Sequence, residues 1–396
     1  MEFDIQDELI RDGVVFYSVL YSTVTVAFAV AVLSKFLTNE FRFGFRSFLS
    51  LIVLFLGEPL CQFLISGPSG LFIFSLGCLI IYSMLPANHL SAQEKAVFIT
   101  GCDSGFGHAL ALKLDHLEMT VFAGCLDDQG TGAADLRDKC SDRLHVLKLD
   151  VTSKEDIESA SKFIEGHVKD KGLWGLVNNA GVWWCAELDM MPEKILHRVM
   201  DVNLFGAVRV TTKLLPLVKR ARGRVVNVSS LLGRMSMEGS GAYAMSKHAI
   251  VAYTNTLRLE MKKHGVSVSI VEPAGFLTGN LQEHTLSKRK EELWSSLDEE
   301  TKQHYGRDYL DALYSHVQSC FQKYPREVSP VVRCIRSGLL SRRPREQYPC
   351  GAGAETMVSI YPLLPVWLAD YVSGSLSILP KNLCPGFVSS TKQGNS

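Results

Sequence analysis

The alternation of short apolar runs with helical periodicities limits the folds open to this chain more than any other feature. The apolar runs, each five or six residues long, lie at 95–100, 120–124, 144–149, 174–178, 224–229 and 266–271. Helical periodicity between them is clearest at 157–168, 192–218 and 242–263. Strands that alternate with helices form a parallel sheet covered on both faces. We therefore predict an α/β fold with a doubly wound parallel sheet, completed by a last strand at 347–351.

The charge balance excludes two classes of protein. Lys and Arg together number 41, as do Asp and Glu, so the formal net charge is zero. A nucleic-acid-binding domain usually carries a basic excess, so we expect no nucleic acid as a partner. Hydrophobic residues make up 47% of the chain and charged residues 21%, which is the reverse of a disordered composition. The ten Cys form no C-x-x-C pair, so we predict neither a disulfide framework nor a bound metal.

The N-terminal part of the chain is apolar enough to enter a membrane. Residues 13–34 contain no charge over 22 positions, and about 20 helical residues cross a bilayer core. An acidic segment precedes this run, where a cleaved signal peptide would be basic. A second apolar stretch, 47–85, is interrupted by Glu58 and by a G-P-S-G sequence at 67–70. This stretch forms either one long helix or two short ones, so the anchor contains two or three helices.

The number of these helices decides which side of the membrane the rest of the chain faces. Lys35, Arg42 and Arg46 follow the first apolar run, and the positive-inside tendency places them in the cytosol. One further span then puts the remaining domain in a lumen, and two put it in the cytosol. We predict a membrane anchor at 1–90, an α/β domain at 91–356 with a substrate lid at 281–330, and an apolar segment and tail at 357–396.

A glycine-rich loop follows the first predicted strand. Residues 100–107 read T-G-C-D-S-G-F-G and open the first helix of the domain. Glycines at such a turn let the backbone approach a pyrophosphate, which the helix N-terminus attracts. The loop therefore predicts a dinucleotide site.

The spacing of this loop, T-G-x-x-x-G-x-G, resembles the short-chain dehydrogenase/reductase family. The sequence N-N-A-G at 178–181 ends the fourth strand, as in that family, and Asn203 lies in V-N-L-F-G. Ser230 follows the fifth strand, and Y-A-M-S-K at 243–247 matches the family's Y-x-x-x-K. These motifs cover about 190 residues in the family's order. The resemblance implies a Rossmann-type sheet, a nicotinamide cofactor and oxidoreductase activity.

The resemblance also assigns residues to the cofactor. We expect it to contact Thr100, Gly101, Asp103, Ser104, Gly105, Phe106, Gly107, Asp127, Asp150, Val151, Asn179, Ala180, Gly181, Tyr243, Lys247, Pro273, Gly275 and Thr278. The glycine loop has no Arg or Lys, and Asp103 would repel the 2′-phosphate of NADP. We therefore predict NAD in preference to NADP.

Four residues form the predicted catalytic group. Tyr243 and Lys247 lie four apart, so they share one face of a helix. A tyrosine is a poor base at neutral pH, but a nearby ammonium and an oxidised nicotinamide both favour the phenolate. We expect Tyr243 to take the hydroxyl proton of the substrate while Ser230 holds its oxygen. By resemblance, Lys247 also grips the nicotinamide ribose and Asn203 anchors a water that relays protons.

The resemblance is strongest to one branch of the family. This branch contains 17β-hydroxysteroid dehydrogenase type 2, retinol dehydrogenases and D-β-hydroxybutyrate dehydrogenase. Trp183 and Trp184 follow Gly181 and predict an apolar substrate wall, although core packing explains them equally well. We expect a lipophilic substrate, a hydroxysteroid or retinol, drawn from membrane lipid. The branch implies the endoplasmic reticulum membrane, with a mitochondrial membrane as the alternative.

Three hypotheses follow. The first is a membrane-anchored NAD-dependent hydroxysteroid or retinol oxidoreductase. The second is an enzyme for a small hydroxy acid such as 3-hydroxybutyrate, whose pocket would need a cation for the carboxylate. The third is an inactive cofactor-binding scaffold, which the intact catalytic group argues against. We predict that the charge run at 288–292 forms a solvated helix face. A homodimer and a homotetramer are both compatible with the sequence.

Overall fold

The computed structural model describes residues 2–38, 50–65, 67–84 and 89–380. It divides into two compact units. The first comprises residues 1–90 with Ser341–Arg343, and the second comprises Ser91–Leu340 with Pro344–Ser396. Arg42 and Arg46, on which the orientation of the anchor depends, lie outside the described residues.

The N-terminal unit is helical. It contains α1 (Glu2–Thr38), a π-helical turn η1 (Val53–Gly57), α3 (Glu58–Leu64) and α4 (Pro68–Met84). Among the described residues, one helical segment is long and apolar enough to cross a membrane: Val15–Ser34, with a mean hydropathy of 1.9. The apolar part of α4, Pro68–Ser83, is shorter.

Side chains of α1 pack against the other helices of this unit. Tyr21 and Phe28 share one apolar cluster with Phe74 of α4. Glu58, the charge that interrupts the second apolar stretch, accepts hydrogen bonds from Ser22 Oγ (3.0 Å) and Thr25 Oγ1 (2.5 Å). Such donors lower the cost of placing a carboxylate among apolar helices.

The second unit is built on a seven-stranded sheet. Its strands are β1 (Ala96–Thr100), β2 (Thr120–Cys125), β3 (Leu144–Lys148), β4 (Gly175–Asn178), β5 (Arg224–Val228), β6 (Ser267–Pro273) and β7 (Gln347–Cys350). They run in the order β3-β2-β1-β4-β5-β6-β7, and every neighbouring pair is parallel. The predicted doubly wound sheet is confirmed, with strand ends that differ from the prediction by one or two residues.

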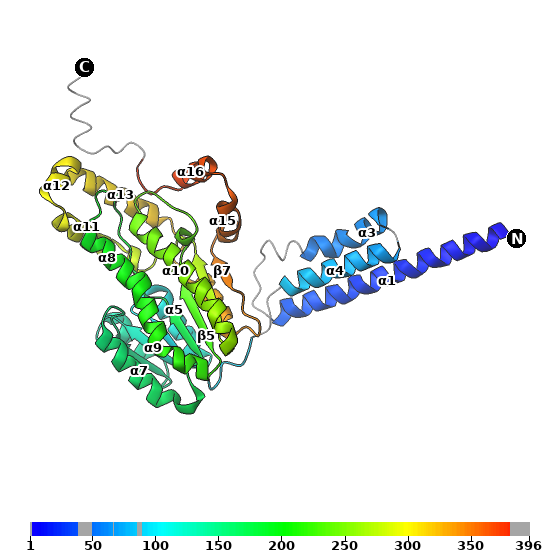
Figure 1. The fold of residues 1–396 in the computed structure, drawn as a ribbon, viewed down its shortest axis with the longest axis horizontal. Coiled ribbons are helices and arrows are strands. Elements are labelled where there is room, and N and C mark those ends of the chain that lie inside the picture. The colour runs from blue at the N-terminus through cyan, green and yellow to red at the C-terminus, as the bar shows by residue number, and fades with distance from the viewer. Residues whose placement is uncertain (1, 39–49, 66, 85–88, 381–396) are drawn as a thin grey trace, which may run out of the picture. The chain divides into compact units, whose positions relative to one another are not determined.

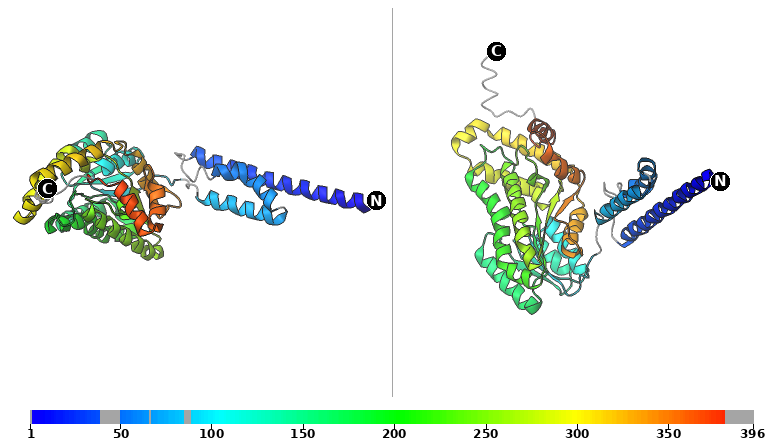
Figure 2. Two further views of the ribbon diagram at one scale, coloured as in Figure 1. Left: turned by 90° about the horizontal axis from the view of Figure 1, so that it is seen from above. Right: turned by 45° about the vertical axis from the view of Figure 1, so that its right-hand side comes forward.

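Helices cover both faces of this sheet (Figures 1 and 2). One face carries α5 (Gly105–His116), α6 (Thr131–Lys139) and α14 (Ser329–Leu340). The other carries α7 (Lys154–Val168), α9 (Ala207–Arg220) and α10 (Gly241–Met261). Because both faces are covered, strands such as β1 and β4 are largely apolar and buried.

The strand order reverses between β1 and β4. Strands β2 and β3 lie on one side of β1, and β4 to β7 lie on the other. Ligands of such sheets bind in the crevice beyond the carboxyl ends of the strands at this reversal. The loops after β1, β4, β5 and β6 begin at this crevice. They carry most of the predicted site residues.

Helices outside the two sheet layers border the same end of the strands. The lid segment, 281–330, contains α11 (Glu283–Ser296), α12 (Glu299–Tyr305) and α13 (Arg307–Gln322), drawn in yellow in Figure 1. It packs on an apolar cluster that includes α8 (Glu193–Met200) and the tryptophans that follow β4. The chain continues after β7 through α15 (Ala354–Ile360) and α16 (Val366–Ser375).

Candidate active site

The glycine loop after β1 is tied to the loop after β4. Thr100 Oγ1 accepts hydrogen bonds from the backbone N–H groups of Asn179 and Ala180, both at 3.0 Å. Asn179 Nδ2 donates in return to the carbonyls of Thr100 (2.9 Å) and Gly101 (3.0 Å). These hydrogen bonds fix the distance between the two loops at the point where the strand order reverses.

Other parts of the backbone lie so close to the glycines of this loop that a side chain would not fit. Gly101 has a φ of +71°, and a Cβ on it would lie 2.9 Å from Ala180 Cα. A Cβ on Gly107 would lie 2.3 Å from the carbonyl oxygen of Gly101. Gly105 also has a positive φ of +63°, and it begins α5. The loop thus presents backbone at a helix N-terminus, which suits a pyrophosphate.

Acidic side chains occupy the far end of the glycine loop. The Asp103 carboxylate accepts hydrogen bonds from the backbone N–H groups of Leu126 (3.0 Å) and Asp127 (2.9 Å), which follow β2. Asp127 accepts a hydrogen bond from Gln129 N at 3.2 Å. Asp150 accepts from the backbone and the hydroxyl of Thr152.

Two cations near β2 were not expected from the sequence. Lys148 donates to the carbonyl of Leu126, and Arg137 Nη1 donates to the carbonyl of Asp128 at 2.7 Å. Neither residue lines the large cavity described below. Since they come from β3 and α6, outside the glycine loop, only the fold brings them close to the end of β2.

Asn203 sits in a π-helical turn, η3 (Asp201–Gly206), between α8 and α9. Its amide accepts from Val182 N (2.7 Å) and donates to Val182 O (2.9 Å) and Ser246 Oγ (3.0 Å). Asn203 thus links the loop after β4 to the helix that carries Tyr243 and Lys247. The continuous helix predicted at 192–218 is interrupted here because a π turn adds a residue, as happens often at functional sites. Its assignment to a proton-relaying water stays a prediction.

Lys247 lies buried behind Tyr243 on α10. Its Nζ donates to the carbonyl of Val228 (3.0 Å) and lies 5.4 Å from the centroid of the Tyr243 ring. Burial lowers the pKa of Lys247 to about 8. The side chain is therefore close to its titration point in the physiological range.

Tyr243 is more weakly acidic than the sequence indicated. Burial raises its pKa to about 12, and a hydrogen bond with the Ser230 side chain acts in the opposite direction. The lowering expected from Lys247 is not found, because desolvation of the buried phenol dominates. Burial thus disfavours the phenolate, and the positive charge of a bound cofactor would act against that effect. The role of Tyr243 as the base stays a prediction.

One cavity of about 1310 Å³ brings most of the predicted residues together. Of the predicted set it is lined by Gly101, Asp103, Ser104, Gly105, Phe106, Asp127, Asp150, Val151, Asn179, Ala180, Gly181, Trp183, Trp184, Ser230, Tyr243, Lys247, Pro273, Gly275 and Thr278. Thr100, Gly107 and Asn203 do not line the cavity. They hold in place the loops and the helix that carry the lining residues. Thr278 packs against the glycine loop, where a Cβ on Gly105 would be 3.2 Å from its Cβ.

The substrate side of the cavity is largely apolar. Trp183 is anchored by a hydrogen bond from Nε1 to Ser240 Oγ (3.1 Å) and contacts Phe321 edge-on, with ring centroids 5.3 Å apart. Trp184 is only 3% exposed. The wall is completed by Met235, Met237, Leu281, Phe321, Tyr324, Leu376 and Ile378.

A buried ion pair supports the loop that carries Ser230. Arg234 Nε lies 2.6 Å from Glu272 Oε1, and the Glu272 side chain is fully buried at the end of β6. Burial raises the pKa of Glu272 and the hydrogen bond from Arg234 opposes that rise. The pair joins the loop after β5 to the loop that begins at Pro273. Its only sequence signal is the single acid of β6, Glu272.

Comparisons with known proteins identify the family of the chain. A family model described as short chain dehydrogenase matches residues 95–289. The chain belongs to the short-chain dehydrogenase/reductase family, and it is an enzyme of the alcohol dehydrogenase type.

Its relatives include dehydrogenases named for retinol and for steroids. Retinol dehydrogenase 7 from Mus musculus is 41% identical over 288 residues, covering 73% of this chain and 90% of that protein. 17-beta-hydroxysteroid dehydrogenase type 6 from Homo sapiens is 41% identical over 281 residues, covering 71% and 88%. Estradiol 17-beta-dehydrogenase 2 from Mus musculus is 37% identical over 306 residues, covering 76% and 80%.

Solved structures share the fold. A short-chain dehydrogenase from Streptomyces avermitilis is 23% identical, with a TM-score of 0.55 over 78% of this chain and 100% of that one. A short-chain dehydrogenase/reductase from Burkholderia phymatum, in complex with NAD, is 23% identical with a TM-score of 0.53 over 62% and 85%.

The residues present fit a nicotinamide cofactor. The glycine loop leaves room for backbone to meet a pyrophosphate, since a Cβ at Gly101 or Gly107 would fill that space. Lys247 lines the other end of the same cavity beside Tyr243 and Ser230. The enzyme therefore uses a nicotinamide cofactor.

Proposed function

We propose that this protein is a membrane-anchored, NAD-dependent oxidoreductase that interconverts an alcohol and its carbonyl on a lipophilic substrate. A hydroxysteroid or a retinol is the substrate class, as the names of the relatives indicate. The observation that carries the proposal is that Ser230, Tyr243 and Lys247 share one cavity with an apolar wall. Apolar pockets with a few convergent polar groups are typical of enzymes for lipophilic small molecules.

The mechanism assigns a role to each of these side chains. When bound, an oxidised nicotinamide supplies a hydride acceptor and a positive charge. Ser230 donates a hydrogen bond to the substrate oxygen as its charge changes. Tyr243 accepts the hydroxyl proton, and Lys247 stabilises the phenolate from the helical turn behind it. Lys247 also holds the nicotinamide ribose.

An acidic side chain of the glycine loop supports a preference for NAD. Asp103 is fixed by two backbone donors and lines the cavity. A 2′-phosphate placed beside this carboxylate would be repelled. The two cations near β2, Lys148 and Arg137, donate to backbone carbonyls. Turnover with NAD should exceed turnover with NADP, and a clear preference for NADP would contradict this assignment.

The anchor is assigned to the N-terminal helices. Val15–Ser34 has the length and hydropathy of a membrane span. We assign the protein to the endoplasmic reticulum membrane, with a mitochondrial membrane as the alternative. The full chain should remain in the pellet after carbonate extraction, whereas a chain without residues 1–86 should be released. Retention of the truncated chain would show that a further segment inserts.

A small hydroxy acid such as 3-hydroxybutyrate is the second candidate substrate. One observation favours it: Arg289 is among the residues that line the cavity, and a carboxylate substrate requires a cation. The apolar wall formed by Trp183, Trp184 and Phe321 favours the lipophilic class instead.

A substrate panel tests the proposal. The full chain, solubilised in detergent, should oxidise estradiol, testosterone or retinol with NAD and leave 3-hydroxybutyrate unchanged. Tyr243→Phe should lose the oxidation while it still binds NADH, which is measured by fluorescence titration. Oxidation of 3-hydroxybutyrate alone would overturn the lipophilic assignment, and wild-type turnover in Tyr243→Phe would remove the proposed base.

A further inference from the structure

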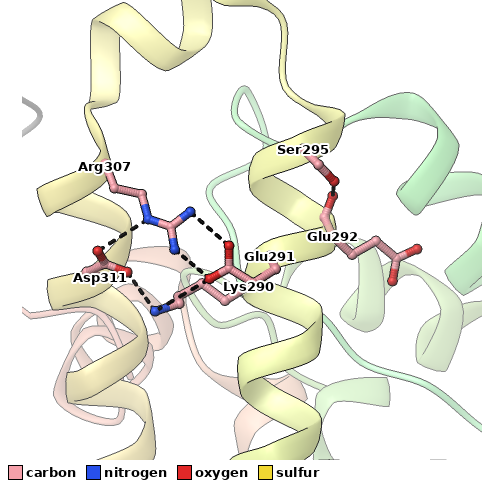
Figure 3. A network of polar contacts seen from close by, with 6 residues as sticks. All are labelled: Lys290, Glu291, Glu292, Ser295, Arg307 and Asp311. Atoms are coloured by element: carbon pink, nitrogen blue, oxygen red, sulfur yellow. Dashed lines mark hydrogen bonds and ion pairs between the residues drawn. The ribbon is translucent and has the colours of Figure 1, made fainter.

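Charged side chains of the lid segment neutralise one another. Lys290 Nζ lies 2.6 Å from Asp311 Oδ1, and Arg307 Nη1 donates to Glu291 at 3.0 Å. Figure 3 shows these four side chains meeting between α11 and α13, where together they carry no net charge. Glu291 is exposed, as predicted for this charge run, whereas Arg289 is only 8% exposed and departs from the prediction.

The end of the sheet where the strands begin has a different charge balance. Three segments lead into β4, β5 and β6 there, at residues 169–171, 219–222 and 262–264. They contain seven lysines and arginines and one acid, Asp170, although the chain as a whole has no net charge. We call the seven cations the basic patch: Lys169, Lys171, Lys219, Arg220, Arg222, Lys262 and Lys263.

The parallel sheet places the three segments next to one another. Gly175 of β4 pairs with Arg224 of β5, and Arg224 pairs with Ser267 of β6. These residues lie at the start of their strands, so the three strands begin in one row. The segments that precede the strands therefore lie along one edge of the sheet, although they are about 50 positions apart in the chain.

Contacts between the segments join them into one surface. Arg220 Nη1 donates to the carbonyl of Lys169 at 2.8 Å, which links the first segment to the second. A Cβ on Gly265 would lie 3.5 Å from Cδ of Arg222, which links the second segment to the third. The seven cations thus belong to a continuous patch on one unit of the structure.

The cations of the basic patch are largely available to a partner. All are exposed except Lys219, which is half-buried. Apart from Lys171, none of them forms an ion pair with another of the described residues. Desolvation and the positive charges of Lys219 and Lys263 lower the pKa of His264, which lies in the third segment. The local field is therefore positive.

An exposed apolar side chain lies beside these cations. Leu259, in the last turn of α10, is 59% exposed. It precedes Lys262 and Lys263 by three and four positions, so the three side chains lie on one side of the helix end. Glu260 reduces the positive charge there by one and leaves it net positive. Cations around an apolar group are typical of a surface that meets lipid headgroups and the acyl chains beneath them.

The chain enters this unit at the same end of the sheet. β1 lies next to β4, and Val97 pairs with Gly175 near the start of both strands. Glu94, two positions before β1, pairs with Lys171 of the basic patch at 3.4 Å. Residues 85–95 connect α4 to β1, and a chain of that length spans at most about 40 Å. A membrane that holds the N-terminal helices is therefore within reach of the basic patch.

We propose that the basic patch binds the anionic headgroups of phospholipids in the membrane that holds the anchor. Phosphate and carboxylate groups on such a surface attract lysine and arginine side chains. A second copy of this chain is a poorer partner, because a two-fold contact would place the same cations against one another. The inference rests on the membrane anchor of the proposed function. It adds a second attachment point, which restricts how the catalytic unit can turn on the bilayer surface.

The rate of lysine acetylation tests this contact. The full chain is incorporated into nanodiscs of phosphatidylcholine, with or without phosphatidylserine, and treated with the uncharged reagent N-acetoxysuccinimide. Mass spectrometry then gives the rate at each lysine. With phosphatidylserine, Lys169, Lys171, Lys262 and Lys263 should react about five-fold more slowly, because a cation beside an anionic surface gains about that factor in affinity. Lys154, exposed at the other end of α7, should react equally in both lipids.

Salt and variants establish that charge is the cause. Molar salt shortens the Debye length to about 3 Å, so it should restore the rates measured in phosphatidylcholine. Replacing both Lys262→Gln and Lys263→Gln should remove most of the protection of Lys169. The matched control is Lys154→Gln with Lys194→Gln, which removes two exposed lysines from the first turns of α7 and α8 and should leave that protection unchanged. None of these four lysines lines the active-site cavity, so both double variants should keep wild-type turnover and Tm.

The outcomes separate the lipid contact from the function on which it rests. Equal rates with and without phosphatidylserine, or an equal slowing of Lys154, would refute the contact and leave the anchor and the reaction standing. Slowing by inorganic phosphate or by RNA in phosphatidylcholine nanodiscs, without an effect of phosphatidylserine, would also refute it and assign the patch to a free anion or a nucleic acid. If the full chain does not enter nanodiscs, the proposed anchor fails and the inference fails with it.

Discussion

Replacement of Gly107 by alanine tests the close packing on which the cofactor loop depends. The added Cβ would lie 2.3 Å from the Gly101 carbonyl oxygen and 2.6 Å from Asn179 Nδ2. That nitrogen donates to the carbonyls of Thr100 and Gly101, so the substitution must displace both hydrogen bonds or shift α5. The loop would no longer hold its spacing to the loop after β4.

The magnitude follows from these contacts. Overpacking costs about 1–3 kcal/mol, and each lost hydrogen bond costs about 1 kcal/mol. The higher helix propensity of alanine offsets at most about 1 kcal/mol. We expect a net loss of about 2–4 kcal/mol, which lowers Tm by about 4–12 °C in a domain of this size. NADH affinity should fall at least ~10-fold, because the helix N-terminus that meets the pyrophosphate is displaced.

Thermal unfolding and NADH fluorescence titration of the detergent-solubilised chain measure both effects. Gly166→Ala is the matched control, because Gly166 lies in α7 and a Cβ there meets nothing within 4 Å. This variant should gain up to about 1 kcal/mol and bind NADH like the wild type. Wild-type stability and NADH affinity in Gly107→Ala would refute the steric reasoning.

Three further perturbations address the charges of the site. Burial lowers the pKa of Lys247 to about 8 in the folded chain. Between pH 8 and pH 10 the unfolded chain therefore binds a proton that the folded chain lacks. The free energy of unfolding consequently rises with pH over this range. Lys247→Met should gain stability over the wild type at pH 7, and thermal melts should show this advantage shrinking towards pH 10; a constant difference would refute the shift. Arg234→Met should destabilise the chain by about 3 kcal/mol, and adding Glu272→Leu should recover part of the loss in chemical denaturation, because the first change alone leaves a buried carboxylate unpaired. Asp103→Ser should lower the ratio of kcat/KM for NAD to that for NADP about ten-fold or more, and an unchanged ratio would show that this carboxylate does not select the cofactor.

The sequence alone determined the fold class and the order of the motifs. Apolar runs separated by helical periodicity specify a parallel sheet, because a strand buried on both faces has no polar side. The glycine loop and the spacing of Tyr243 and Lys247 are local patterns, and local geometry places each of them on a turn or on one helical face. The chain's membership of the family rests on the order of these motifs.

Only the tertiary structure decided how the residues of the site are charged and paired. The Arg234–Glu272 pair joins segments 38 residues apart, and its formation depends on which loops the sheet brings together. Desolvation raises the pKa of Tyr243, although the sequence places a lysine one helical turn away. Arg289 lies in a run of charges and yet lines the cavity, because the packing of α11 between α8 and α13 selects which side of the helix faces inward. Desolvation and long-range pairing depend on the whole fold, so no local spacing contains them.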